Sequence, residues 1–227
     1  MGLLDADVYG PDIPLMLNLT RTTQRRQWPL WRNPAARPLS FDPVEVLGLK
    51  VMSVGFLIAE DQALSLPASS IQLVLRQLVE QVSWGELDYL LVDLPPGTAD
   101  VQQAIVELLR PAQALVVVSP QDVAHLDAKK VLAMLREAGV PVVGGVENMT
   151  QLVCPHCGGE VELYPPVRAS RSIWTDGVKR LAAIPFDPEL TRTAERGRPL
   201  LTARPDSPQA GLFRQMADAL AATLTDV

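Results

Sequence analysis

The sequence predicts an α/β fold with a mostly parallel sheet and helices on both faces. Three apolar runs, residues 88–93, 113–119 and 140–147, are continuous rather than alternating. Continuous runs are typical of parallel strands that are covered on both faces. Helical patterns separate these runs, and strands that alternate with helices form parallel sheets with crossover helices.

The clearest helical pattern covers residues 123–139, and Gly139 is expected to end that helix. Small and apolar residues recur there every three or four positions and predict one buried stripe: Ala124, Ala128, Val131, Leu135 and Ala138. Asp187 and Ser207 are each followed by a proline, so each is expected to cap a later helix.

Length and composition predict one domain over residues 1–227. The chain is 48% hydrophobic, which is enough for a sizeable core. Its net charge of −6 argues against a nucleic-acid partner. No stretch approaches the roughly 18–20 unbroken apolar residues of a membrane span, and the first residues do not resemble a secretory signal. We therefore expect a cytoplasmic protein without a membrane partner.

Polar residues collect where the predicted strands end. Asp5 and Asp7 follow the first apolar run, and residues 93–100, 119–122 and 147–149 follow later ones. A single aspartate at a strand end is more often a cap or a turn former than a ligand. Ligands bind at the carboxyl edge of parallel sheets, so four polar loops at that edge predict a binding site.

The stretch LLVDLPPGTAD, which contains Asp93 and Gly97, is the most informative of these loops. An apolar strand that ends in aspartate is the Walker B arrangement, in which the carboxylate holds Mg²⁺ beside nucleotide phosphates. Gly97 would leave its backbone N–H open to a γ-phosphate. The alternative is an ordinary strand, turn and helix capped by Thr98 or Asp100, which explains the shape but not Asp93.

The only two cysteines, Cys154 and Cys157, lie in the motif VCPHCGG within a predicted cluster loop over residues 150–164. Two thiols at this spacing can hold one metal centre, but a closed zinc site needs four ligands and a [4Fe–4S] cluster needs four thiolates. A second copy of the chain would supply the missing pair, which predicts a twofold homodimer around one cluster.

The same motif, C-P-H-C, is also the active-site sequence of some thiol–disulfide redox proteins. In those proteins it opens a helix, and the helix lowers the thiol pKa. Here two glycines and the extended-looking stretch EVELY follow, which favours a cluster ligand over a redox site. His156 between the cysteines is interpreted as a loop residue.

Several motifs in the same order resemble the Mrp/ApbC-type iron–sulfur cluster carrier ATPases, a deviant-Walker P-loop group that also holds MinD and the nitrogenase iron protein. They are GLLDADVYGPDIPLML, LKVMSVGFL, WGELDYLLVDLPPGTADVQ, VENMTQLVCPHCGG and IPFDPEL, and the similarity extends from Gly2 to about Leu224. The resemblance implies a P-loop NTPase-like fold of the SIMIBI type. It also implies a homodimer that passes a bridging [4Fe–4S] cluster to apoproteins, coupled to ATP binding and hydrolysis.

The resemblance also implies roles for individual residues. Asp7 would orient the attacking water near the γ-phosphate of Mg-ATP. The other implied roles are Asp5 near Mg²⁺, Asp93 as the Walker B carboxylate, Gly97 as the switch II glycine, Asn148 at the adenine edge, and Pro185 and Asp187 lining the base pocket.

One family motif is absent from these 227 residues, because no G-x-x-x-x-G-K-S/T sequence occurs. Relative to the family, the first β-loop-α unit is expected to be missing, which would leave a vacant central position in the sheet. The chain as sequenced is therefore predicted to be inactive as an ATPase. An alternative function is a cluster-binding scaffold that has lost nucleotide chemistry. A MinD-like membrane ATPase is rejected, because the last helix lacks a basic face.

Overall fold

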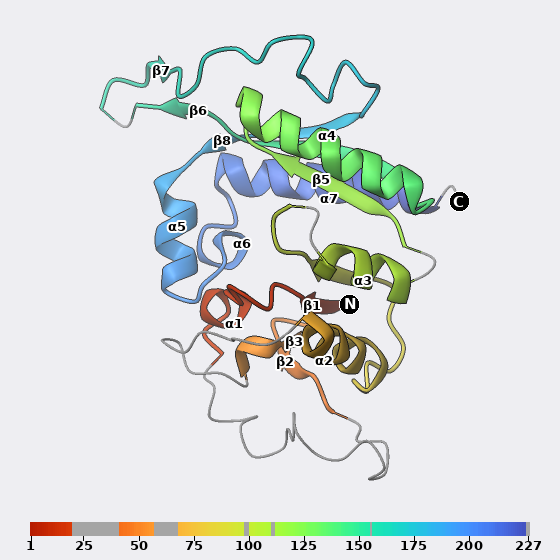
Figure 1. The fold of residues 1–227 in the computed structure, drawn as a ribbon. Helices are drawn as coiled ribbons and strands as arrows, with labels where there is room; N and C mark the ends of the chain where they lie inside the picture. The colour runs from red at the N-terminus through yellow and green to blue at the C-terminus, as the bar shows by residue number, and fades with distance from the viewer. Residues whose placement is uncertain (20–40, 57–67, 98–99, 110–111, 155, 226–227) are drawn as a thin grey trace. The chain divides into compact units, whose positions relative to one another are not determined.

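The computed structural model describes residues 1–19, 41–56, 68–97, 100–109, 112–154 and 156–225 (Figure 1). The chain forms two compact units, which are described separately. The first contains Met1–Arg110 and Ala194–Arg198, and the second contains Pro111–Thr193 and Pro199–Val227. The expectation of a single domain over residues 1–227 stays a prediction.

The first unit is built on a four-stranded sheet in the order β2-β3-β1-β4. Its strands are β1 (Gly2–Asp5), β2 (Val44–Val46), β3 (Leu49–Ser53) and β4 (Leu90–Asp93). β1 is parallel to both β3 and β4, whereas β2 is antiparallel to β3. β1 therefore has a parallel neighbour on each side, and its last residue lies between the ends of two other strands.

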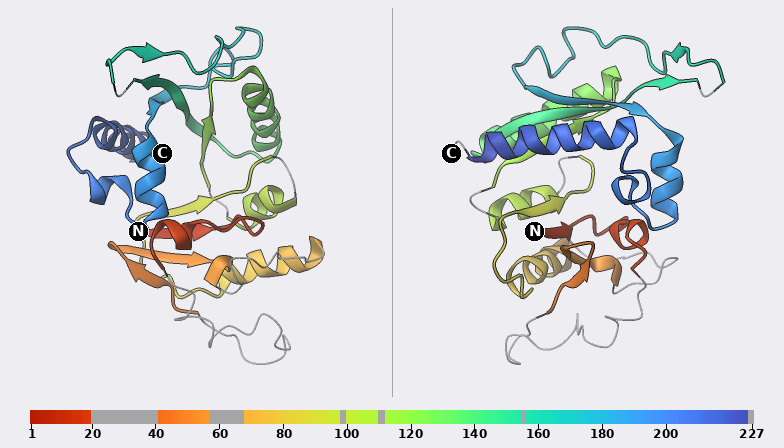
Figure 2. Two further views of the ribbon diagram at one scale, coloured as in Figure 1. Left: turned by 90° about the vertical axis from the view of Figure 1, so that its left-hand side faces the viewer. Right: turned by 180° about the vertical axis from the view of Figure 1, so that it is seen from behind.

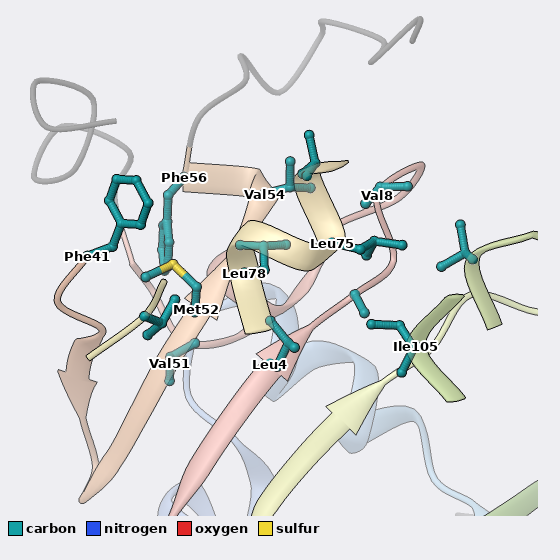
Figure 3. Packing of buried hydrophobic residues seen from close by; sticks show 14 of the residues in the cluster. Leu4, Val8, Phe41, Val51, Met52, Val54, Phe56, Leu75, Leu78 and Ile105 are labelled. Atoms are coloured by element: carbon teal, nitrogen blue, oxygen red, sulfur yellow. The ribbon is translucent and has the colours of Figure 1, made fainter. Parts of the chain in front are cut away.

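Three α-helices accompany this sheet: α1 (Ile13–Met16), α2 (Ala68–Glu80) and α3 (Asp100–Leu108). A 3₁₀ turn, η1 (Val54–Phe56), follows β3 directly. Leu75 and Leu78 of α2 lie over the strands and join one buried cluster with Leu4 and Met52 (Figure 3). Each such side chain contributes about 1.5–3 kcal/mol when fully buried, so this cluster holds the strand ends of the site in place.

The second unit is built on a sheet with β6 at its centre. Its strands are β5 (Ala114–Val118), β6 (Val142–Val153), β7 (Glu160–Val161) and β8 (Arg180–Phe186). β5 and β8 are parallel to β6, and β7 pairs with the end of β6 in antiparallel orientation. β6 runs past the other strands, so its last residues and β7 form a hairpin.

Four α-helices belong mainly to this unit: α4 (Asp122–Glu137), α5 (Pro188–Glu195), α6 (Leu200–Ala203) and α7 (Pro208–Thr225). α4 and α7 lie on opposite faces of the sheet (Figure 2). Together with the parallel pairings in both units, this arrangement confirms the prediction of a mostly parallel α/β fold. No described helix combines the length and the apolar character that crossing a bilayer requires.

The predicted ends of the helices are confirmed. Gly139 follows α4 with a φ of +69°, a left-handed conformation that glycine adopts without strain. The N–H of Glu189 donates to Asp187 Oδ1 at 2.9 Å, and the N–H of Ala210 donates to Ser207 Oγ at 3.2 Å. Both capping side chains therefore accept a hydrogen bond from the first turn of their helix.

The predicted buried stripe of α4 is only partly correct. The buried residues are His125, Ala128, Leu132 and Leu135, whereas the other three predicted members of the stripe, Ala124, Val131 and Ala138, are only half-buried. The pattern missed His125 because histidine does not count as apolar. It is fully buried all the same, since its ring has a backbone partner.

Candidate functional site

The residues predicted to form the site lie in three places. Asp5, Asp7, Asp93 and Gly97 belong to the first unit, at the ends of β1 and β4. The base-pocket candidates and the cysteines belong to the second unit.

Asp5 is the last residue of β1 and is fully buried. Its two oxygens accept hydrogen bonds from the last residue of β3 and from the loop that follows β1. Ser53 Oγ donates to Asp5 Oδ2 at 2.8 Å, and the N–H of Asp7 donates to Asp5 Oδ1 at 3.2 Å. These two hydrogen bonds, one to each carboxylate oxygen, hold Asp5 in one orientation.

The electrostatics of this cluster favour a bound cation. Burial raises the pKa of Asp5 to about 7, against the opposing effect of the Ser53 hydrogen bond, and the charge of Asp93 raises it further. The pKa of Asp93 is raised as well, first by desolvation and then by the charges of Asp7 and Asp12. A metal ion would relieve this repulsion between carboxylates. Mg²⁺ is usually held by one or two carboxylates together with waters and phosphates, so Asp5 and Asp93 fit it only as two ligands of such a site.

Asp7 has a structural task in the loop after β1. Its Oδ1 atom accepts hydrogen bonds from the N–H groups of Tyr9 at 3.1 Å and Gly10 at 3.0 Å. Asp7 therefore acts at least as a turn former, which is the more common role of an aspartate at a strand end. Its role in orienting a water molecule stays a prediction.

Gly97, in the turn after β4, has a φ of +96°. A side chain there would meet no described atom within 4 Å. The requirement for glycine therefore comes from the backbone conformation and not from crowding. The proposed role as a switch glycine stays a prediction.

The base-pocket candidates lie on neighbouring strands of the second unit. Asn148 on β6 is in register with Ile184 on β8, and Pro185 and Asp187 follow Ile184 in the chain. Asn148 Oδ1 accepts the N–H of Met149, which has a φ of +61°. Asp187 caps α5 through its own oxygen. Asn148 therefore lies in the middle of β6, beside the last residues of β8, and the contacts of all three residues with a nucleotide stay predictions.

Cys154 and Cys157 lie in the turn between β6 and β7. The N–H of Cys154 donates to the carbonyl oxygen of Gly159 at 2.8 Å, and the N–H of Gly158 donates to that of Cys154 at 2.9 Å. The backbone N–H groups of Cys157 and His156 donate to the Cys154 sulfur and lower the pKa of its thiol. N–H donors favour the thiolate, which is the form that binds metals.

The surroundings of the two cysteines agree with a ligand role and not with a helix-opening redox motif. Within the described residues, the motif is followed by a turn and then by β7, as the stretch EVELY predicts for its first two residues. No group of three or more histidine, cysteine or acidic side chains suited to a metal ion occurs in the part of the chain that the structure describes. The turn therefore supplies two thiols and no third ligand of its own.

Sequence reasoning missed Ser53 as part of the acidic cluster. Ser53 ends β3 and is fully buried, and its hydroxyl accepts the N–H of Gly55 while it donates to Asp5. The signal was a small polar residue directly after the apolar pair Val51 and Met52. The sequence alone could not reveal that β3 pairs with β1 in the register that brings Ser53 to Asp5.

The fold and the carboxylate cluster at the strand ends define the class of protein. The structure resembles a nucleotide-binding protein from Archaeoglobus fulgidus solved in complex with ADP, with a TM-score of 0.70 and 30% sequence identity over 93% of this chain and 78% of that one. It shares its fold with the cell division ATPase MinD from Pyrococcus furiosus, with a TM-score of 0.65 and 18% identity over 97% of this chain and 85% of that one. The chain therefore has the α/β fold of the P-loop NTPases.

The sequence comparison is more specific. The chain belongs to the ParA-type family described as NUBPL iron-transfer P-loop NTPase, which matches residues 1–221. It is 35% identical over 96% of its length to an iron–sulfur protein required for NADH dehydrogenase from Arabidopsis thaliana, and 35% identical over 97% to an iron–sulfur cluster carrier protein from Aquifex aeolicus. The chain spans 66% and 58% of the length of these two relatives.

Proposed function

We propose that this chain carries an iron–sulfur cluster, held between two copies by Cys154 and Cys157, and delivers it to apoproteins in the cytoplasm. The observation that carries this proposal is the two-thiol turn at the end of the β6–β7 hairpin. Backbone hydrogen bonds from Cys157 and His156 lower the pKa of the Cys154 thiol, which favours the thiolate form that binds metals. The names of the relatives from Aquifex and other bacteria support the same function.

The number of thiols supports a second copy and a [4Fe–4S] cluster. Each chain offers two cysteines, and a cubane cluster needs four thiolates. Apolar side chains also lie exposed beside the turn: Met149 on β6, Val153 at its end and Val161 on β7 are each 38–48% exposed. Burying these side chains against a second hairpin would favour the same twofold pairing that completes the ligand set.

The acidic cluster of the first unit supports the contacts with Mg²⁺ and nucleotide phosphates that the family resemblance implies. In the first unit, Asp5 and Asp93 would hold Mg²⁺ and Asp7 would orient water. In the second unit, taken by itself, Asn148 and the IPFDP segment would contact an adenine ring. Mg²⁺ would neutralise the phosphate charges as the nucleotide binds. In this proposal the thiol pair binds the cluster, and nucleotide binding to these 227 residues is weak, because they contain no G-x-x-x-x-G-K-S/T loop to hold the phosphates.

Anaerobic reconstitution tests the cluster proposal. The wild-type chain should bind about four irons per two chains and sediment as a dimer when loaded. Cys154→Ser and Cys157→Ser should each abolish the visible charge-transfer absorbance, whereas His156→Asn, a matched change in the same turn, should retain it. A double serine variant with a full iron complement would refute the proposal, and so would a loaded monomer.

A further inference from the structure

A buried polar cluster in the second unit has no part in the proposed function. Its centre is His125 on α4, which is fully buried. The ring accepts the N–H of Ile173 at its Nδ1 atom, with a distance of 3.2 Å. The ring of Trp174 meets the imidazole edge to face, with 5.7 Å between the ring centroids. His125 therefore contacts two consecutive residues of the chain that leads from the cysteine hairpin to β8.

We define residues 168–178 as the anchored segment, because polar contacts bind it to α4 and β6 along its length. Asp122, in the first turn of α4, accepts the N–H of Arg168 at 2.9 Å and Arg171 Nη1 at 3.2 Å. Lys129, two turns further along α4, donates to the carbonyl oxygen of Ser170 at 3.2 Å. The same ammonium group forms an ion pair with Asp176 at 2.9 Å.

Between these exposed anchors, Ile173 is fully buried and packs in the core with Val116 and Ala128. Trp174 Nε1 donates to Glu147 Oε1 on β6 at 3.1 Å. The docking also uses close packing, because a Cβ atom at Gly145 on β6 would lie 2.8 Å from the ring of Trp174. The hydrogen bond from Ile173 to His125 is thus the buried centre of the anchored segment.

The geometry determines which form of His125 can make this bond. Nδ1 accepts a hydrogen bond, so it carries a lone pair, and the single proton of the neutral ring is on Nε2. Nε2 faces Glu147 Oε1 at 3.9 Å and has no hydrogen-bond partner among the described residues. A second proton would have to go on Nδ1, where it would meet the N–H of Ile173 donor to donor.

We propose that His125 is an acid-sensitive anchor, whose protonation on Nδ1 breaks its bond to Ile173 and releases the anchored segment from α4. The segment joins the cysteine hairpin to β8, so its release would free the C-terminal side of that hairpin.

The surrounding charges do not remove the cost of a buried imidazolium. Three charged side chains of the described residues act on the imidazole, and each has an ion partner. Glu147 on β6 binds Arg180 of β8 at 2.7 Å, and on α4 Asp122 binds Arg168 and Arg171 while Lys129 binds Asp176. Burial lowers the pKa of His125 below its ordinary 6.5, which outweighs the opposing effects of Glu147 and Asp122, and Lys129 lowers it further.

The sign of the pH effect follows from this direction. A released His125 gains a proton below pH 6.5, whereas the docked ring stays neutral to a lower pH. The docked state therefore loses stability as the pH falls below 6.5. The equilibrium constant for release should rise up to roughly tenfold per pH unit until the docked ring itself is protonated.

Hydrogen exchange measured by mass spectrometry tests the proposal on the whole chain. After correction for intrinsic exchange, peptides from residues 168–178 should lose protection up to roughly tenfold between pH about 6.5 and about 5.5, while peptides of α7 should not. His125→Gln can accept the Ile173 N–H without titrating, so its segment should stay protected at both pH values. The chain has one other histidine, and the matched control His156→Gln should keep the wild-type pH response.

A wild-type segment whose protection does not change with pH would overturn the proposal, and so would a His125→Gln variant that keeps the pH response. If that variant does not fold, nuclear magnetic resonance of the wild-type chain decides the question. The two histidine rings can be followed separately, and the Ile173 amide signal should shift with the midpoint of His125. A titration midpoint of His125 at or above pH 6.5 would refute the mechanism. So would an Ile173 amide signal that does not shift as His125 titrates.

Discussion

Asp5 and Asp93 are register partners at the carboxyl ends of two neighbouring parallel strands. Two carboxyl groups that repel each other are therefore held side by side by the hydrogen bonds of the sheet. Burial of Asp5 is the main cause that raises its pKa to about 7, and the charge of Asp93 raises it further. Near neutral pH, the surroundings of Asp5 therefore disfavour the charged form of its carboxyl group.

Asp5→Asn should stabilise the first unit at alkaline pH. The pKa of Asp5 is 3.8 as a reference and about 7 in the folded chain, so the folded state binds the extra proton between these values. Folding stability therefore falls as the pH rises from about 4 to about 7, and the variant avoids this loss. We expect a gain of about 1–3 kcal/mol in the free energy of unfolding at pH about 8, shrinking toward zero at pH about 4.

Urea denaturation at the two pH values measures this gain. Asp88→Asn is the matched control, since Asp88 is exposed just before β4 and its change should stay within about 0.5 kcal/mol. Equal destabilisation of the Asp5→Asn variant at both pH values would contradict the prediction.

Gly197→Ala should destabilise the first unit. Gly197 has a φ of +63°, and a Cβ atom there would lie 2.3 Å from the Cβ of Asn18. Backbone strain and overlap together should cost about 1–3 kcal/mol, measured as a lower midpoint of urea unfolding. Gly211→Ala is the control, because Gly211 lies in α7 with nothing within 4 Å and should gain up to about 1 kcal/mol. A higher urea midpoint for Gly197→Ala than for Gly211→Ala would refute this account.

Cys154 should react as a thiolate at lower pH in the folded chain than in the unfolded chain. Backbone N–H groups of Cys157 and His156 stabilise the Cys154 sulfur anion and lower the pKa of the thiol, and unfolding removes them. The Cys157→Ser variant leaves Cys154 alone, and its alkylation rate by iodoacetamide can be followed against pH with and without urea. Identical midpoints in the two conditions would show that the turn does not favour the thiolate.

The 227-residue polypeptide should bind Mg-ATP weakly and should not hydrolyse it at a meaningful rate. Phosphoryl transfer depends on positioning and on charge stabilisation, and these residues contain no G-x-x-x-x-G-K-S/T loop to hold the phosphates. The carboxylates of Asp5, Asp7 and Asp93 would instead repel a polyphosphate. Calorimetry and phosphate release measure both properties, and micromolar binding would show that another phosphate site exists.

Much of the fold could be predicted because local chemistry decides it. Continuous apolar runs predicted β4, β5 and β6, and the capping residues Asp187 and Ser207 predicted where α5 and α7 begin. The spacing of apolar residues and the capping of helices depend on near neighbours in the chain, so a single sequence is sufficient to show them. The same is true of Cys154 and Cys157, whose spacing shows that they can share a metal centre.

The relations between distant residues were decided only in the tertiary structure. Strand register brings Ser53 to Asp5 across 48 positions of sequence and sets Asp93 beside Asp5 on the other side of β1. Packing of residues 168–178 against α4 places Ile173 on the ring of His125, another contact across 48 positions. Residues so far apart meet only when the sheet and its helices assemble, because the burial and hydrogen bonds that hold them belong to the whole fold and not to either segment alone.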